Sequence, residues 1–176
     1  MDHDHYDDAL IAAVLSDVRT VAMIGASANT VRPSYFVMKY LLAKGYRVIP
    51  INPGLSGLKI LDQDVIATLA DLEAPVEMVD IFRNSDAALE VTREALRMKD
   101  KLGLKVIWMQ LGVRNDVAAA EAEAAGLRVI MNRCPKIEYG RLSGEIGWAG
   151  VNKGLISSRR PILGPGVQSQ LIGPKG

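Results

Sequence analysis

V-A-M-I-G-A-S at residues 21–27, followed by R-P-S at residues 32–34, is the stretch that decides the fold of this chain. Residues 21–24 form a short apolar run, which is typical of a buried parallel strand. Residues 33–44 have the pattern of a helix. A turn with glycine between a strand and a helix points backbone N–H groups and a helix N-terminus at an anion. Arg32 would add a fixed positive charge. We therefore predict the first strand-to-helix turn of a nucleotide-binding fold.

The rest of the chain repeats this alternation of strand and helix. We predict further strands at residues 47–51, 77–82, 105–110 and 128–131. We predict helices at residues 6–15, 85–99, 116–125 and 137–142, a loop at 55–64 and a short helical turn at 66–72. Such alternation favours a parallel sheet with helices on both faces. The predicted fold class is α/β, a Rossmann-like three-layer domain with a mainly parallel sheet of five or six strands.

The predicted domain ends at about residue 142. Residues 143–176 are rich in glycine and proline and lose regular periodicity, so we interpret them as a C-terminal tail. Four apolar residues are expected to anchor the first part of this tail on the domain or on a partner subunit: Trp148, Val151, Leu155 and Ile156. A homodimer is therefore left open.

Composition limits the possible functions. The chain has 176 residues, 49% of them hydrophobic, and a net charge of +1, so bulk charge favours neither a nucleic acid nor an anionic membrane as partner. The N-terminus is acidic and polar, unlike a secretory signal, and no apolar run reaches the roughly 20 residues that span a bilayer. With one cysteine, the sequence fits a reducing, cytoplasmic setting.

Catalytic and metal-binding patterns are weak in this sequence. The two histidines, His3 and His5, lie in an N-terminus that we expect to be frayed and solvated. No Ser-His or Cys-His pair can form in the predicted core, and no His/Cys cluster has metal-ligand spacing. Asp80 lies inside a predicted strand, either as a carboxylate near the site or, as we prefer, as a structural aspartate. These patterns favour a binding module with no catalytic residue and no metal.

A nicotinamide cofactor is the usual ligand of such a fold, but two features oppose it. Ser27 and Thr30 stand where the dinucleotide fingerprint has its second and third glycines. Asn52 follows the second predicted strand, where an acidic residue would hold the ribose hydroxyls. An NAD(P)-binding oxidoreductase or redox sensor therefore remains an alternative, as does an interaction protein with a vestigial nucleotide site.

An ordered set of motifs carries a more specific resemblance. The chain resembles the stand-alone CoA-binding proteins of bacteria and archaea, which are similar to the N-terminal CoA-binding domain of the succinyl-CoA synthetase α subunit. The motifs are G-A-S at 25–27, R-P-S-Y at 32–35, V-I-P-I-N-P-G at 48–54, D-I-F-R at 80–83, W-M-Q-L-G-V at 108–113 and R-C through E-Y at 133–139. The match spans about residues 21–142. The phosphohistidine of the synthetase belongs to a second domain that this chain lacks, so ligase activity is not implied.

The resemblance implies a domain that binds coenzyme A or an acyl-CoA, as a non-catalytic carrier or sensor. It places the phosphates near Gly25, Ala26, Ser27, Arg32, Pro33 and Ser34, the nucleotide near Asn52, Pro53, Gly54, Phe82 and Arg83, and the pantetheine arm near Gln110, Leu111, Gly112 and Cys134. The physical argument agrees, because a pyrophosphate and a 3′-phosphate are suited to arginines and backbone donors. Lys39 is a further candidate cation, as is Arg133.

Cys134 raises a separate hypothesis. Arg133 and Lys136 are its neighbours in sequence, and positive charge favours the reactive thiolate. Since CoA ends in a thiol, a mixed disulfide between Cys134 and CoA is chemically reasonable under oxidising conditions. The alternative, which we prefer, is that Cys134 packs as a small buried hydrophobe.

Overall fold

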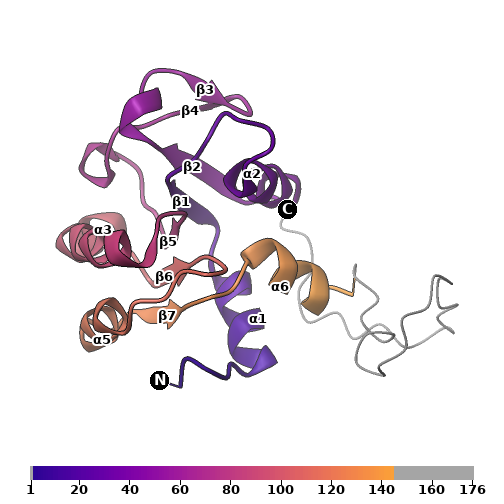
Figure 1. The fold of residues 1–176 in the computed structure, drawn as a ribbon, viewed down its shortest axis with the longest axis vertical. Coiled ribbons are helices and arrows are strands. Elements are labelled where there is room, and N and C mark those ends of the chain that lie inside the picture. Colours follow the sequence, from indigo (N-terminus) through magenta and orange to yellow (C-terminus); the bar gives the residue numbers. More distant parts are fainter. Residues whose placement is uncertain (1, 145–176) are drawn as a thin grey trace, which may run out of the picture.

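A computed structural model describes residues 2–144 of the chain as one parallel sheet between two layers of helices (Figure 1). The predicted tail from residue 145 onward, with its anchoring residues, lies outside the described residues. The sheet has five strands in the order β2-β1-β5-β6-β7, and each pairing is parallel. Its strands are β1 Thr20–Ile24, β2 Arg47–Ile51, β5 Met78–Ile81, β6 Val106–Met109 and β7 Arg128–Ile130. The predicted fold class is confirmed.

The helices divide between the two faces of the sheet. One face carries α1 Asp8–Asp17, α2 Pro33–Ala43 and α6 Pro135–Leu142, and the other carries α3 Ser85–Arg97, α4 Lys99–Leu102 and α5 Asp116–Ala124. Figure 1 shows α2, α6 and α1 on one side of the strands and α3 and α5 on the opposite side. Each face has its own hydrophobic core, as expected for a doubly wound sheet.

Alternate residues of the central strands supply these two cores. Met23 and Trp108 pack towards α1, α2 and α6, whereas Val79 and Ile107 pack towards α3 and α5. Strands β5 and β6 are buried throughout, so their sequences are apolar without alternation, except for the buried Asp80 in β5.

One predicted loop contains a small hairpin instead. Within residues 55–64, strands β3 Lys59–Ile60 and β4 Gln63–Asp64 pair in antiparallel fashion, so the loop prediction was wrong there. The two turn residues, Leu61 and Asp62, have φ angles of 48° and 62°. A two-residue turn with both φ angles positive favours Asn-Gly or Asp-Gly, and the sequence lacks that signal. The short helices η1 Pro53–Leu55 and η2 Leu69–Asp71 flank this region.

The N-terminus is packed at His3 and Tyr6, contrary to our expectation, whereas the side chain of His5 is 88% exposed, as expected. The side chain of His3 is only 8% exposed, with Nδ1 2.8 Å from the Tyr6 hydroxyl and Nε2 3.3 Å from Glu123 Oε1. The backbone N–H of Met131 donates to the same hydroxyl at 2.8 Å. Composition alone cannot reveal these contacts, because they join the N-terminus to β7 and α5, more than a hundred residues away.

Candidate functional site

The strand order brings two strand ends together at one edge of the sheet. The chain passes from β1 outward to β2 and then returns to β5 on the other side of β1, so the carboxyl ends of β1 and β5 flank the switch point. Ligands of open α/β sheets bind at this place. A cleft of about 600 Å³ opens here, lined by Gly25, Ser27, Arg32, Pro33, Ser34, Val37, Phe82, Arg83, Asn84, Gln110, Leu111, Val113, Cys134 and Ile137.

Gly25 ends β1 in a conformation that only glycine adopts readily. Its φ is +80°, and a Cβ atom at this position would lie 2.5 Å from the carbonyl oxygen of Phe82. Its N–H donates to the carbonyl of Ile51 at 3.0 Å. Gly25 therefore lets the ends of β1, β2 and β5 approach one another closely, which forms the floor of the cleft.

The first turn of α2 offers the cleft one backbone donor, the Ser34 N–H, because the N–H groups of Arg32 and Tyr35 donate to the carbonyls of Asn29 and Arg32. Arg32 is the N-cap residue and its side chain makes no capping hydrogen bond, while Pro33 occupies the first helical position, where its missing N–H costs nothing. The N-terminal N–H groups of a helix need an outside partner. This turn can therefore accept an anion from the cleft.

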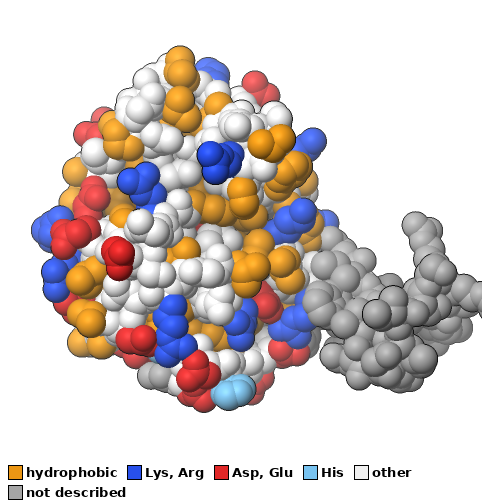
Figure 2. Space-filling view, viewed as in Figure 1, with side chains coloured by type: hydrophobic (Ala, Val, Ile, Leu, Met, Phe, Trp, Pro, Cys, Tyr) orange, Lys and Arg blue, Asp and Glu red, His pale blue; other side chains and the backbone are white. Residues whose placement is uncertain are grey.

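Two arginines stand at this end of the cleft. Arg32 and Arg83 are both exposed, and within residues 2–144 neither forms an ion pair with an acidic side chain. By contrast, Arg93 is paired with Glu121 at 2.7 Å and Arg141 with Asp8 at 2.6 Å. The cleft thus keeps cationic groups available. In Figure 2, apolar and uncharged groups fill the middle of the face, and both basic and acidic side chains surround them.

The opposite end of the cleft is built from buried side chains of β5 and β6. Gln110 Nε2 donates to both carboxyl oxygens of Asp80, at 2.9 and 3.0 Å. Asp80 is fully buried, and desolvation raises the pKa of its carboxyl group to about 8 despite the hydrogen bond from Gln110. Asp80 is thus a buried structural aspartate that also lies near the site, because it fixes Gln110, which lines the cleft.

Cys134 is the N-cap residue of α6 and lines this second end. Burial raises the pKa of its thiol, and this effect outweighs the backbone N–H groups of Ile137 and Lys136, which lower the pKa. Lys136 lowers the pKa of the thiol, as expected of a positive neighbour, but burial outweighs it, so the net shift disfavours the thiolate. Arg133 lies over the ring of Tyr6, and Lys136 over that of Tyr40, so both cations have other partners.

A smaller hollow of about 190 Å³ lies next to the cleft, and Gly25 and Arg83 line both. It is lined further by Asn52 and Pro53 and by residues that the sequence did not suggest: Ala67, Thr68, Leu69, Val91 and Glu94. Asn52 itself is held in place, because its Nδ2 donates to the Ala26 carbonyl at 2.8 Å and its Oδ1 accepts from the Gly54 N–H at 2.9 Å.

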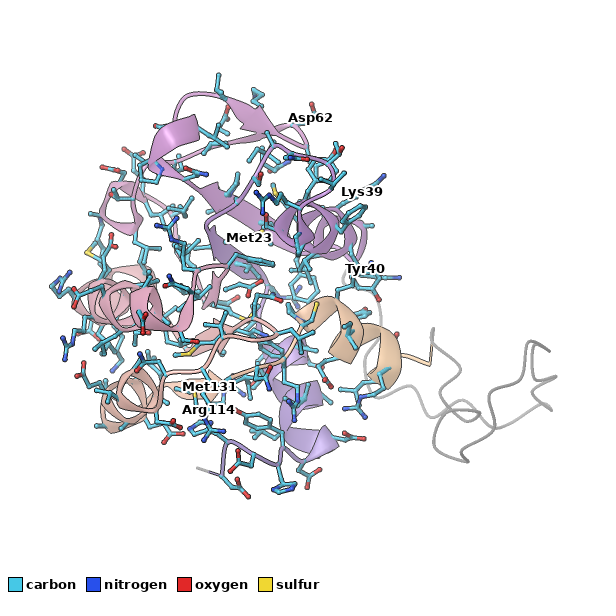
Figure 3. The ribbon with its side chains drawn as sticks, viewed as in Figure 1. Met23, Lys39, Tyr40, Asp62, Arg114 and Met131 are labelled. Atoms are coloured by element: carbon cyan, nitrogen blue, oxygen red, sulfur yellow. The ribbon has the colours of Figure 1, made fainter. Side chains whose placement is uncertain are left out.

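Most predicted site residues thus meet at one edge, but four line neither hollow: Ala26, Lys39, Gly54 and Gly112. Ala26 and Gly54 instead hold Asn52, and the Gly112 N–H donates to Asn132 Oδ1 at 2.8 Å. Lys39 is exposed on α2 (Figure 3). Whether any of these residues binds a ligand stays a prediction.

The structure also adds cleft residues that we did not select. Val37, Asn84, Val113 and Ile137 line the cleft. Asn84 directly follows two predicted site residues, but its side chain caps α3 by accepting from the Ala87 N–H. Ile137 lies in the first turn of α6, which begins at Pro135 rather than at residue 137 as predicted. The proline at the helix start could have revealed this earlier boundary.

Within residues 2–144, no group of three or more His, Cys, Asp or Glu side chains is arranged to hold a metal ion. In the same part of the chain, no helix has the length and apolar character needed to cross a membrane.

Comparison with known proteins assigns the family. The family model described as CoA binding domain matches residues 19–140, and the chain therefore belongs to this CoA-binding-domain family. YneT of Bacillus subtilis (strain 168) is 29% identical over 131 residues, which cover 74% of this chain and 93% of that protein.

Two solved structures are also similar. A Pyrococcus horikoshii OT3 protein is 34% identical, with a TM-score of 0.72 over 79% of this chain and 94% of that chain. A Thermus thermophilus protein is 33% identical, with a TM-score of 0.71 over 77% of this chain and 98% of that chain. The match to this chain therefore extends over nearly the whole length of each of these relatives.

Proposed function

We propose that this chain binds coenzyme A or an acyl-CoA in the cleft, as a carrier or sensor without turnover of its own. The observation that carries the proposal is the division of the cleft into two unlike ends. One end has the Ser34 N–H at the start of α2 and two arginines without an acidic partner in the described part of the chain, and the other is apolar and partly buried around Gln110. CoA has the same division, because an anionic nucleotide is joined to a long neutral arm.

The anionic part fits the end at β1 and α2. Phosphate oxygens would accept from the Ser34 N–H at the start of α2, and Arg32 and Arg83 would supply charge-assisted hydrogen bonds. The smaller hollow, which shares Arg83 with the cleft, would take part of the nucleotide. The arm would then run towards Gln110 and Cys134.

The geometry around Asn52 disfavours NAD as the ligand. Both polar atoms of its side chain are used within the protein, by Ala26 and Gly54. The position that holds the ribose hydroxyls in NAD-binding domains therefore has a structural task here. This supports CoA over a nicotinamide cofactor.

The proposal includes no turnover because the cleft pairs no nucleophile with a histidine. Ser27, Ser34 and Cys134 line the cleft, and its lining residues include no histidine. In the described part of the chain, His3 instead contacts Tyr6 and Glu123.

Isothermal titration of the full chain with CoA, acetyl-CoA, NAD, NADP and ATP tests the proposal. We expect CoA or acetyl-CoA to bind clearly more tightly than the other three ligands. Tighter binding of NAD or NADP would overturn the proposal in favour of a redox role, and binding of none of the five would leave the cleft without a nucleotide function. The relative affinities of CoA and acetyl-CoA would show whether the free thiol or an acyl group is preferred.

A further inference from the structure

Asp80 is an unusual residue for the middle of a parallel strand. Its side chain is 0% exposed, and it lies in register with Met23 on β1 and Trp108 on β6. Within residues 2–144, Gln110 is the partner that satisfies its carboxyl group, through both oxygens. Burial of a carboxyl group with a single neutral partner is costly. An apolar residue would pack at this position without that cost, so the carboxyl group calls for a functional explanation.

The contact with Asp80 fixes which way the Gln110 amide faces. Its nitrogen is turned to the carboxyl group, and in the described part of the chain its carbonyl oxygen Oε1 accepts no hydrogen bond. Gln110 is 6% exposed, and it lines the cleft. Oε1 is therefore the amide atom left for a ligand. Since Gln110 lines the cleft, a ligand donor placed there would replace solvent at Oε1.

The surroundings of Gln110 make this acceptor selective. Its neighbours in the lining include the apolar side chains of Val113 and Ile137 and the thiol of Cys134. A ligand N–H group placed among them would lose its water and would need a protein acceptor. A ligand carbonyl facing Oε1 would be repelled, since both atoms are acceptors.

We propose that Asp80 is a positioning residue that turns the carbonyl oxygen of Gln110 towards the cleft, so that this end of the cleft selects a ligand arm with an N–H donor, such as a secondary amide. The inference rests on the proposed function and adds the chemistry by which the arm is recognised. When ionised, above its pKa of about 8, the Asp80 carboxylate offers acceptors only and admits one orientation of the Gln110 amide, whereas the protonated carboxyl group below that pH offers a donor as well. Asparagine at position 80 would offer a donor as well and would admit both orientations.

The test compares two ligands at pH 9, where Asp80 has acceptors only. CoA carries the amide arm, and adenosine 3′,5′-bisphosphate lacks it. In Asp80→Asn and in Gln110→Met, we expect CoA to bind roughly five- to tenfold more weakly, as for the loss of one hydrogen bond. The affinity for adenosine 3′,5′-bisphosphate should not change. The double variant should lose no more than Gln110→Met alone, because Asp80 acts through Gln110.

A matched control removes a buried hydrogen bond elsewhere. The Tyr46 hydroxyl donates to the Leu15 carbonyl at 2.7 Å, next to the opposite, amino end of β2. Tyr46→Phe should leave the ratio of the two affinities unchanged, whatever it does to the melting temperature. If the ratio of the CoA affinity to the adenosine 3′,5′-bisphosphate affinity fell as much in Tyr46→Phe as in Asp80→Asn, the effect would be a general structural one. That result would overturn the positioning role of Asp80.

The wild-type protein supplies a second measurement that needs no variant. CoA analogues in which one amide of the arm is replaced by an ester lose the N–H donor and keep the shape. At pH 9, we expect one of these analogues to bind roughly five- to tenfold more weakly than CoA. Unchanged affinity for all of them would overturn the inference, as would an unchanged ratio of affinities in Asp80→Asn. If the wild type bound neither CoA nor adenosine 3′,5′-bisphosphate, the proposed function itself would fail.

Discussion

The two ends of the cleft are built in opposite ways. The end at β1 and α2 consists of backbone and exposed cations, with Gly25 at the strand end and Arg32 at the helix start. The end at β6 and α6 is built around a buried side chain, Gln110, which is fixed by Asp80, beside the exposed apolar side chains of Leu111 and Ile137. An exposed cationic end can hold any phosphate group, whereas a fixed buried amide can distinguish one neutral group from another. The comparison assigns affinity for anions to the first end and selectivity to the second.

The helix starts at the cleft are also built in different ways. Helix α3, whose N-cap Asn84 lines the cleft, is capped by the Asn84 side chain, as α5 is by Asn115. Such a cap is worth about 1 kcal/mol. Helix α2 has proline at the first position and no capping hydrogen bond from Arg32, so it forgoes that stabilisation and leaves the Ser34 N–H open to the cleft.

The largest expected effect is a loss of stability at the end of the cleft formed by β1 and α2. Gly25→Ala would place a methyl group 2.5 Å from a backbone carbonyl, at a positive φ angle, and should lower the free energy of unfolding by about 3 kcal/mol or more. Gly112→Ala is the matched control. Gly112 also has a positive φ, but a Cβ there meets nothing within 4 Å, so the cost should be about 1 kcal/mol. Urea unfolding measures both, and equal losses would contradict the close approach at Gly25.

The next effect concerns the second end and depends on pH. Burial raises the pKa of Asp80 from 3.8 to about 8, so the folded protein holds a proton that the unfolded chain releases. The stabilisation is complete below about pH 4 and is lost as the pH rises to about 8. In that range the wild type should lose up to about 1.4 kcal/mol of stability per pH unit relative to Asp80→Asn. Urea unfolding from pH 5 to 7.5 measures this difference, and parallel pH profiles of the two proteins would refute it.

Arg32 offers a smaller test of the first end. Arg32→Ala should weaken CoA binding roughly tenfold or more, as for the loss of a charge-assisted hydrogen bond, with little change in stability. Lys39→Ala is the control, because Lys39 is an exposed cation of the same helix that does not line the cleft. Calorimetric titration at low salt should show a loss for Arg32→Ala only. Equal losses in both variants would indicate general attraction rather than a contact at the cleft.

The smallest effect concerns the thiol. Because burial raises the pKa of Cys134, we expect it to react several-fold more slowly at pH 7.5 than an exposed cysteine of ordinary pKa. The chain has one cysteine, so a thiol assay on the whole protein reports on this residue alone. A rate above that of free cysteine would restore the hypothesis of an activated thiol, and mass spectrometry after incubation with CoA disulfide would show whether the mixed disulfide forms.

Sequence patterns predicted the layers of this fold well because they depend on local signals. The five strands are short apolar runs, and the helices between them have clear starts, such as Asn115 before α5. The hairpin of β3 and β4 was missed because its turn uses Leu61 and Asp62, which rarely adopt positive φ angles. The packed N-terminus was missed because it depends on contacts with α5 and β7.

The sequence predicted the candidate site only through the predicted positions of the strand ends. The rule that ligands lie at the carboxyl ends of parallel strands, together with the motifs, brought Gly25, Arg83 and Gln110 to one cleft. It could not show that Asp80 holds Gln110, because residues 80 and 110 meet only when β5 and β6 pair. Nor could it show that Arg133 and Lys136, adjacent to Cys134 in sequence, contact aromatic rings instead.

A crystal structure of the complex with CoA tests the central claim most directly. The account predicts phosphate groups at the start of α2, within hydrogen-bond distance of Arg32 or Arg83, and the arm in the cleft with an amide N–H donating to Gln110 Oε1. CoA bound in the reverse direction, with its phosphates at Gln110, or bound away from the carboxyl ends of β1 and β5, would contradict the account.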